Sequence, residues 1–327
     1  MSSAAAETVW CNLTLSPENQ ARLRAGIGAR RLVFAALPVP GNLPLGREDP
    51  SLAEADIVYG QPDAQQAARV TRLRFIQASS AGVAAFDAPA VRDVLAAHGT
   101  QLASSSSVFA DPCAEHVLAL VLAHVRRLSV AFVNQSGPRG WPKAAMRTGA
   151  RLLRGQTVVI VGMGTIGRRL CQLLTPFAVN LIGVRRRPRG DEPVGTITLD
   201  GIDAALARAD FVIDLLPGGA DAVRFFTAAR FAAMKPGAVF VNIGRGTTVD
   251  QDALADALAD GHLDAAYLDV TDPEPLPPEH PLWANPRCMI TPHSAGGHAD
   301  EPHRLVAHFL ANLARWERGE PIVDRVI

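Results

Sequence analysis

The chain of 327 residues has no excess of charge of either sign, since its 32 lysines and arginines balance 32 aspartates and glutamates. A neutral chain creates no long-range field that would draw it to nucleic acid or to an anionic membrane surface. No apolar run approaches the length of a membrane-spanning helix, and residues 1–7 lack the basic and then apolar pattern of a secretory signal. The sequence therefore predicts a cytoplasmic protein that binds neither nucleic acid nor a membrane.

Cysteine is scarce, and the four cysteines are scattered along the chain at Cys11, Cys113, Cys171 and Cys288. No two of them have the close spacing of a metal-binding motif or a disulfide framework. We therefore predict that the thiols only pack, that the compartment is reducing, and that the protein holds no metal.

The length suits two domains rather than one hydrophobic core, and hydrophobic residues make up 48% of the chain, which supports substantial burial. In the first part of the chain, short apolar runs alternate with helix-like polar segments, which predicts a parallel α/β sheet. The strands expected there are residues 8–13, 31–37, 56–60, 74–78 and 101–103, with a proline-rich loop over residues 38–50.

A glycine motif follows the apolar run Val158–Val161, which reads as a buried strand. Gly162, Gly164 and Gly167 fit G-x-G-x-x-G and are followed by helix-forming residues, the order that a dinucleotide site requires. The glycines permit a tight turn, backbone approach to a pyrophosphate and close helix packing, while the helix N-terminus attracts the phosphates. We predict that the three glycines, with Thr165 and Ile166 between them, bind a dinucleotide. The alternative is a purely structural turn between strand and helix.

Three arginines directly follow the next expected strand, residues 180–184. An acidic residue usually accepts hydrogen bonds from the ribose 2′-hydroxyl there, whereas this chain has Arg185, Arg186 and Arg187, the first lying 18 residues after Gly167. Guanidinium groups bind a 2′-phosphate in a forked manner, so the sequence favours NADP(H), with NAD(H) as a second cofactor. The alternative is a solvated arginine run.

Polar residues follow several later strands of the same region. The expected strands are residues 211–216, 238–243, 265–270 and 288–291, and ligands in doubly wound sheets bind beyond such strand ends. Arg245, Glu274 and His293 each follow a different one of these strands. We therefore expect the three side chains to converge at one sheet edge.

Two helices complete the predicted architecture. The long apolar helix 113–132, with the arm that follows it, is expected to contact a second subunit, and helix 301–318 is expected to pack on the first domain. We predict two Rossmann-like or flavodoxin-like α/β domains with parallel sheets. A doubly wound cofactor domain, residues 105–293, is inserted in a smaller substrate domain made of residues 1–104 and 294–327.

These motifs, taken in order, resemble the D-isomer-specific 2-hydroxyacid dehydrogenases. The resemblance implies that Arg245, Glu274 and His293 are catalytic. It also implies that Asp269 contacts the nicotinamide carboxamide, and that subunits pair through the cofactor domain as a homodimer. A backbone turn at Ala81 and Gly82 would hold the substrate carboxylate, and Pro217 and Ile243 would line the cofactor. The matching segments include Ala114–His116, Val161–Gly167, Met234–Gly237, Asn242–Gly246, Leu268–Val270, Glu274–Leu276 and Thr291–His293.

The chain departs from the usual family pattern at a few positions. Ala84 replaces an aspartate after the substrate turn, Ser104 replaces an asparagine, and Gly219 and Ala222 replace threonines. Arg185 in place of the acidic ribose ligand resembles the glyoxylate and hydroxypyruvate reductases of the family.

The expected reaction is hydride transfer between NAD(P)H and a small 2-oxo acid, glyoxylate or hydroxypyruvate first. Arg245 would bind the substrate carboxylate, and His293 would donate the proton. Glu274 would orient the imidazole and stabilise its charged form. The structural alternatives are an ion pair for Arg245 and a solvated loop acid for Glu274. The alternative function is a non-enzymatic dinucleotide-sensing scaffold of the same fold.

Overall fold

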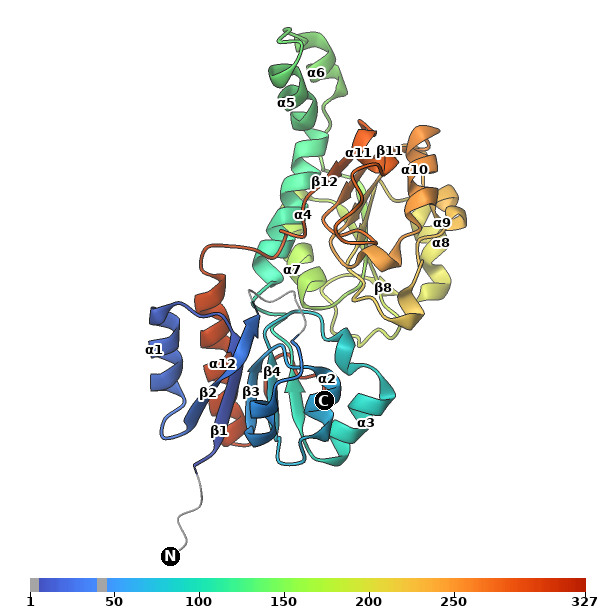
Figure 1. The fold of residues 1–327 in the computed structure, drawn as a ribbon. Helices are drawn as coiled ribbons and strands as arrows, with labels where there is room; N and C mark the ends of the chain where they lie inside the picture. The colour runs from blue at the N-terminus through green and yellow to red at the C-terminus, as the bar shows by residue number, and fades with distance from the viewer. Residues whose placement is uncertain (1–5, 40–45) are drawn as a thin grey trace, which may run out of the picture. The chain divides into compact units, whose positions relative to one another are not determined.

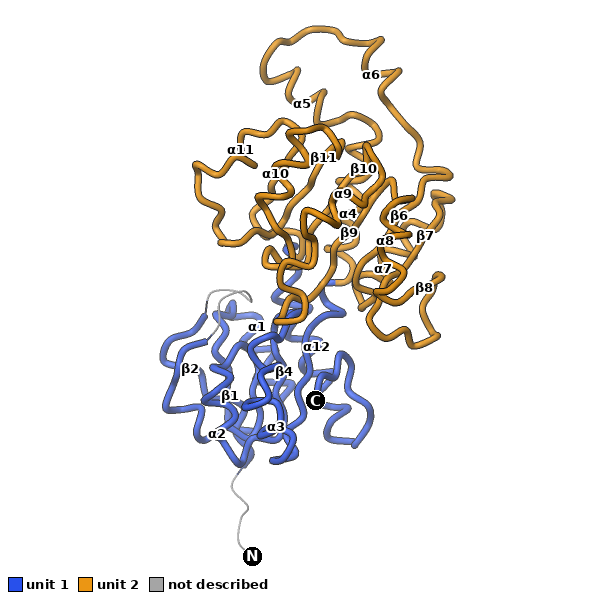
Figure 2. The backbone as a smooth tube through the Cα atoms, turned by 90° about the vertical axis from the view of Figure 1, so that its right-hand side faces the viewer, with its two compact units in different colours: residues 1–109, 297–327 blue, residues 110–296 orange. Residues whose placement is uncertain are grey.

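The computed structural model describes residues 6–39 and 46–327, and the chain divides into two compact units (Figure 2). Unit 1 comprises the residues up to Phe109 together with Gly297–Ile327, and unit 2 comprises Ala110–Gly296. Unit 2 is therefore inserted in the sequence of unit 1. The assignment of unit 1 to substrate and of unit 2 to the dinucleotide stays a prediction.

Unit 1 is built on a five-stranded parallel sheet with the order β2-β1-β3-β4-β5. The residues of β1, β3 and β4 are buried on both faces of the sheet, whereas the edge strand β2 is partly exposed. Pro38 extends β2 instead of ending it, and residues 40–45 of the expected loop lie outside the described residues. The strands are β1 (Thr8–Leu13), β2 (Arg31–Val39), β3 (Ile57–Gly60), β4 (Phe75–Ala78) and β5 (Gln101–Ala103).

Helices cover both faces of this sheet, with α1 and α12 on one face and α2 and α3 on the other. The predicted packing of the C-terminal helix on unit 1 is confirmed, since Phe309 of α12 stacks on Tyr59 of β3 with ring centroids 4.6 Å apart. The helices are α1 (Pro17–Gly26), α2 (Ala64–Arg69), α3 (Pro89–Ala97) and α12 (Glu301–Glu317), with 3₁₀ turns at Pro50–Glu54 and Ala84–Phe86.

Unit 2 contains a seven-stranded parallel sheet with the order β12-β11-β10-β9-β6-β7-β8. The strand order reverses between β6 and β9, which makes this a doubly wound sheet with its switch point at that pair. The predicted fold class is thereby confirmed. The strands are β6 (Thr157–Val161), β7 (Asn180–Val184), β8 (Thr196–Ile197), β9 (Phe211–Asp214), β10 (Ala238–Asn242), β11 (Leu263–Leu268) and β12 (Cys288–Ile290).

The helices of unit 2 form two layers: α4 and α7 pack together, and α8, α9 and α10 share the core on the other face of the sheet. The helices are α4 (Ala110–Val125), α5 (Leu128–Ser136), α6 (Lys143–Gly149), α7 (Thr165–Leu174), α8 (Ile202–Leu206), α9 (Ala228–Ala233), α10 (Gln251–Ala259) and α11 (Pro281–Ala284). The 3₁₀ turns are Thr175–Phe177, Leu199–Gly201, Ala220–Ala222 and Gly246–Thr248.

The prediction of one long helix over residues 113–132 is wrong. Arg127 adopts a left-handed backbone conformation, with φ of 59°, which ends α4 and starts α5 in a new direction. Figure 1 shows α5 and α6 projecting beyond the sheet of unit 2, and neither helix contains a buried residue. Within the described residues no single helix has the length and apolarity to cross a membrane; α4 and α5 reach that threshold only together, across a 73° bend.

Candidate active site

The glycine turn after β6 has the close contacts that a dinucleotide-binding motif requires. Gly162 has φ of 110°, and a β-carbon there would lie 2.8 Å from the carbonyl oxygen of Leu215. A β-carbon at Gly167 would lie 2.5 Å from the Gly162 oxygen, so α7 packs tightly against the turn. A β-carbon at Gly164 would instead face open space. Gly164 directly precedes Thr165 and Ile166 at the N-terminus of α7, and no side chain caps this helix end.

The arginines after β7 lie beside this turn. Arg185 donates from Nη1 to the carbonyl oxygen of Met163 at 3.2 Å, and the same nitrogen lies 3.4 Å from Glu192 Oε1. Arg186 is exposed and pairs with Asp221 at 2.6 Å. The first arginine therefore contacts the glycine motif directly, while the second reaches across to the segment after β9.

Two further loops lie at the same edge of the sheet. Pro217 lies in the loop after β9, and Ile243 follows β10 directly. A β-carbon at Gly244 would lie 2.6 Å from the Leu216 carbonyl oxygen, so the two loops are in close contact.

Arg245 lies in the turn after β10, and its backbone is fixed by the end of that strand. Asn242 accepts from the Gly244 amide at 2.8 Å and donates to the Arg245 carbonyl oxygen at 3.0 Å. The guanidinium donates to the Gly244 carbonyl oxygen at 2.6 Å. Burial lowers the pKa of Arg245 below its usual value, while the nearby negative charge of Glu274 opposes this shift.

Glu274 and His293 are brought together although they follow different strands. His293 Nδ1 donates to Glu274 Oε1 at 2.6 Å. His293 has φ of 51°, an uncommon conformation for a residue other than glycine, and its amide donates to the Asp269 carbonyl oxygen at 2.8 Å. Glu274 and His293 thus form a hydrogen-bonded pair, and Arg245 follows the neighbouring strand β10 at the same edge of the sheet.

Asp269 has a structural contact that the sequence analysis missed. The side chain is buried: Oδ1 accepts from the Thr291 hydroxyl at 2.5 Å and the Ser294 amide at 2.9 Å, and Oδ2 accepts from the Ala295 amide at 2.9 Å. These bonds fix the turn that carries His293. The sequence signal was an aspartate at a strand end with a Thr-Pro-His-Ser turn at the next strand. The expected contact with the nicotinamide carboxamide stays a prediction.

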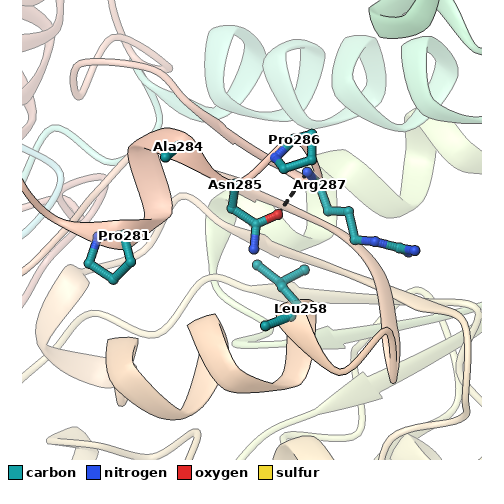
Figure 3. A pocket seen from close by; sticks show the side chains of 7 residues that line it. Leu258, Pro281, Ala284, Asn285, Pro286 and Arg287 are labelled. Atoms are coloured by element: carbon teal, nitrogen blue, oxygen red, sulfur yellow. Dashed lines mark hydrogen bonds between the residues drawn. The ribbon is translucent and has the colours of Figure 1, made fainter.

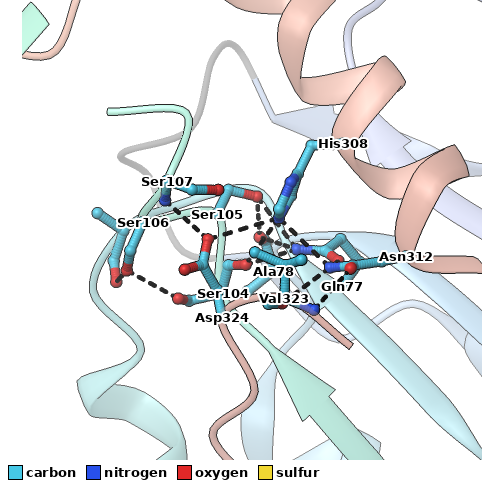
Figure 4. A network of polar contacts seen from close by, with 11 residues as sticks. Gln77, Ala78, Ser104, Ser105, Ser106, Ser107, His308, Asn312, Val323 and Asp324 are labelled. Carbon is cyan, nitrogen blue, oxygen red and sulfur yellow. Dashed lines mark hydrogen bonds and ion pairs between the residues drawn. The ribbon is translucent and has the colours of Figure 1, made fainter. Parts of the chain in front are cut away.

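The turn with Ala81 and Gly82 belongs to unit 1, where a polar network supports it (Figure 4). The Ser80 hydroxyl donates to the Gly82 carbonyl oxygen at 2.6 Å, and the Ser106 hydroxyl donates to that of Ala81 at 3.0 Å. Buried Gln77 of β4 donates to the carbonyl oxygen of Ser104 at 2.7 Å, which connects β4 to the segment after β5. The same network includes Asn312 and His308 of α12 and Asp324 of the C-terminal segment.

Two hollows on unit 2 lie apart from these residues. One, of about 290 Å³, is bounded by Leu258, Pro281 and Arg287 (Figure 3), and the other, of about 620 Å³, lies between α9 and α10. Neither is lined by a predicted site residue. Over residues 6–39 and 46–327, no group of three or more His, Cys, Asp or Glu side chains could hold a metal ion.

Comparison with known families gives a match over the larger unit. Residues 118–295 match the model of the D-isomer specific 2-hydroxyacid dehydrogenase, NAD binding domain. Over 234 residues the chain is 36% identical to a mouse glyoxylate reductase/hydroxypyruvate reductase, covering 70% of each chain. Over 292 residues it is 32% identical to glyoxylate/hydroxypyruvate reductase B of Citrobacter koseri, covering 86% of this chain and 87% of that protein.

Solved structures are similar over nearly the whole chain. One is the NADPH-dependent glyoxylate/hydroxypyruvate reductase of Sinorhizobium meliloti in complex with NADP and sulfate, with a TM-score of 0.78, 27% identity and 98% coverage of both chains. Another is the D-isomer specific 2-hydroxyacid dehydrogenase of Xanthobacter autotrophicus Py2 in complex with NADPH and MES. Its TM-score is 0.80 at 26% identity, covering 99% of this chain and 98% of that one.

Proposed function

Because the chain belongs to the D-isomer specific 2-hydroxyacid dehydrogenase family, we propose that it reduces glyoxylate or hydroxypyruvate to the 2-hydroxy acid, with NADPH as the preferred hydride donor. As a member of this family it is an oxidoreductase that binds a nicotinamide dinucleotide. The observation that carries the proposal is the 2.6 Å hydrogen bond between Glu274 and His293, which lies at the sheet edge that also holds Arg245.

His293 is the proton donor in this proposal. Its Nδ1 is engaged by Glu274, which orients the ring and stabilises the imidazolium form, so Nε2 is the nitrogen that gives its proton to the carbonyl oxygen. Arg245 binds the substrate carboxylate and polarises the carbonyl with its forked donors. The dinucleotide, when bound, supplies the hydride that reaches the carbonyl carbon.

The glycine turn fits the dinucleotide because Gly164 has open space where a side chain would stand, at an uncapped helix end. We assign Gly162, Gly164, Thr165, Ile166 and Gly167 to the pyrophosphate. Pro217, Ile243 and Asp269 are assigned to the nicotinamide end. Preference for NADP(H) is supported by Arg185, which contacts the glycine turn, and by Arg186 beside it. NAD(H) is the weaker cofactor in this proposal.

Unit 1 is assigned to the substrate through the turn at Ala81 and Gly82. Serine hydroxyls engage both carbonyl oxygens of this turn, and its N–H groups are proposed as donors to the substrate carboxylate.

Unit 2 is assigned to homodimer formation through the projecting helices α5 and α6. Large apolar side chains are exposed there, including Phe132 at 67%, Val133 at 70% and Trp141 at 90%. A second copy of the chain would remove these apolar side chains from water, which stabilises the dimer. Light scattering tests the assembly: a dimer that Phe132→Ser and Trp141→Ser together convert to a monomer supports it, and a monomeric wild-type protein contradicts it.

The activity is tested by following NADPH and NADH oxidation with glyoxylate, hydroxypyruvate and larger 2-oxo acids. General acid catalysis contributes about 10²- to 10⁴-fold, so His293→Ala should lose activity on that scale while its dissociation constant for NADPH stays near that of the wild type. Replacement of the exposed His98 by Ala is the matched control and should change neither quantity.

Two results would contradict the proposal. Normal turnover of His293→Ala would remove His293 from the reaction. Tight NADPH binding by the wild type with no turnover on any 2-oxo acid would favour the dinucleotide-sensing scaffold instead.

A further inference from the structure

A fully buried carboxyl lies at the end of β9, beside the turn that carries Arg245. Asp214 is the last residue of β9 and has no exposed surface. Its Oδ1 accepts from the Leu216 amide at 2.9 Å, and its Oδ2 lies 2.5 Å from the Thr248 hydroxyl. A buried carboxyl is costly unless its partners compensate for lost water, so this pairing with Thr248 calls for a physical explanation.

Thr248 connects Asp214 to the main chain of Arg245. It closes the 3₁₀ turn Gly246–Thr248 that follows Arg245, and it is fully buried. Its Oγ1 lies 2.6 Å from the Arg245 carbonyl oxygen as well as 2.5 Å from Asp214 Oδ2. Together with Asn242, which donates at 3.0 Å, the Thr248 hydroxyl is the second side-chain group within hydrogen-bond distance of the Arg245 carbonyl oxygen.

One hydroxyl proton cannot satisfy both acceptors. A threonine hydroxyl has a single proton to donate and two lone pairs to accept with. Both short contacts of Thr248 are hydrogen bonds only when Asp214 is protonated and donates to Oγ1, which frees the hydroxyl proton for the Arg245 carbonyl oxygen. When Asp214 is ionised, the hydroxyl donates to the carboxylate, and Asn242 is left as the side-chain donor to Arg245.

We propose that Asp214 is a positioning residue that acts through the Thr248 hydroxyl to fix the main chain at Arg245, and thereby the affinity of the enzyme for the substrate carboxylate. The inference rests on the proposed function, in which Arg245 binds that carboxylate. Asp214 itself does not touch the reacting atoms in this proposal.

Ionisation of Asp214 falls near neutral pH. Burial raises the pKa of this carboxyl from 3.8 to about 7, although the bonds from Thr248 and Leu216 oppose the shift. Its neighbours across the sheet, Val161 of β6 and Asn242 of β10, are uncharged.

The other charged groups near this network lie on the segments around Thr248. Segment 220–226 packs beside Thr248 through the Phe226 amide. On it, Arg224 lies 3.6 Å from Asp250, and Asp221 pairs with Arg186. Arg245 is also charged, and Thr248 contacts its carbonyl oxygen.

The test compares one substitution of Thr248 that removes the hydroxyl with one that keeps it. Thr248→Val keeps the branched shape without the hydroxyl, and Thr248→Ser keeps the hydroxyl. One lost hydrogen bond is worth about 0.5–1.5 kcal/mol, so Thr248→Val should raise the KM for glyoxylate about 3- to 10-fold, with little change in the dissociation constant for NADPH. Thr248→Ser should stay within about twofold of the wild type by the same reasoning. Equal KM values for the two variants would overturn the proposal.

Asp214→Asn supplies a second, pH-dependent test. Its amide donates permanently to Oγ1, as the protonated acid does, while its oxygen still accepts from Leu216. The wild type should lose this bond as the pH increases through about 7, whereas the variant keeps it. The ratio of the wild-type KM for glyoxylate to the variant KM should therefore increase over the same pH range. A ratio that stays constant from pH 5.5 to 9 would overturn the proposal.

Hydrogen exchange of residues 243–249 in the same variants separates this inference from the proposed function. If the wild type reduces no 2-oxo acid, the proposed function fails. Faster exchange in Thr248→Val but not in Thr248→Ser would still support the positioning of the Arg245 turn. Equal exchange in the two variants would overturn it, whatever the activity.

Discussion

Replacement of Asp214 by asparagine should stabilise the protein at alkaline pH and much less at acidic pH. The carboxyl is fully buried, and burial raises its pKa from 3.8 to about 7. The folded state therefore binds more protons than the unfolded state between these two values, and the free energy of unfolding falls as the pH rises across this range. Asparagine has nearly the same shape and carries no ionisable group. The free energy of unfolding of the variant should therefore not fall in this way as the pH rises.

The size of the effect follows from the two pKa values. A shift of one unit corresponds to about 1.36 kcal/mol, so a shift of about three units makes the ionised Asp214 cost about 4 kcal/mol once the pH exceeds both values. At pH 5 the group is still largely protonated in the folded state. The stability difference between variant and wild type should therefore grow by about 2–3 kcal/mol from pH 5 to pH 8.

Urea denaturation at pH 5 and pH 8, followed by circular dichroism, measures this difference. Asp210→Asn is the matched control, because Asp210 directly precedes the same strand but its side chain is 22% exposed and pairs with Lys235 at 2.6 Å. The control should show no comparable growth between the two pH values. A stability difference for Asp214→Asn that stays constant, or that falls from pH 5 to pH 8, would refute the argument from burial.

Three further predictions concern the site and the core. Arg245→Lys should lower kcat/KM for glyoxylate by about 10²-fold or more, because a point charge does not replace a two-donor fork; unchanged kinetics would contradict its role. Arg185→Asp combined with Arg186→Ser should shift the ratio of kcat/KM for NADPH and NADH towards NADH by about tenfold or more, since carboxylate repels a 2′-phosphate; an unmoved ratio would make the arginines surface residues. Phe309→Ala should lower the free energy of unfolding by about 3–5 kcal/mol, because the ring is fully buried and stacks on Tyr59 at 4.6 Å; thermal denaturation measures the loss, and an unchanged midpoint would contradict it.

Much of the fold could be predicted from the sequence because parallel strands are buried on both faces. Val158–Val161 is such a run, and every residue of it is fully buried in β6. The break after α4 could not be predicted in this way. Hydrophobicity continues from Cys113 to Phe132, while the chain direction changes at one left-handed residue, Arg127. Apolar patterns carry no information on such a single backbone angle.

Convergence of the site residues was also open to sequence reasoning, because parallel strands bring their carboxyl ends to one edge. The contacts that support the site residues could not be predicted in this way. Asp214 lies inside the expected strand 211–216, and a carboxyl within this apolar run is the sequence signal of its contact. Its partner Thr248 is 34 residues away in sequence, and only tertiary structure pairs the two.

Asp214 and Asp269 support neighbouring turns in the same manner, but with different numbers of donors. Each follows or ends a strand and contacts the turn after the adjacent strand. Asp214 of β9 has one contact with the Arg245 turn after β10, and Asp269 after β11 accepts several hydrogen bonds from the His293 turn after β12. Asp269 receives two main-chain amides and one hydroxyl, whereas Asp214 receives one amide and one hydroxyl. Donors favour the ionised form and burial opposes it. Because Asp214 has few donors to offset complete burial, its pKa rises to about 7, and it is the group through which pH reaches the turn that carries Arg245.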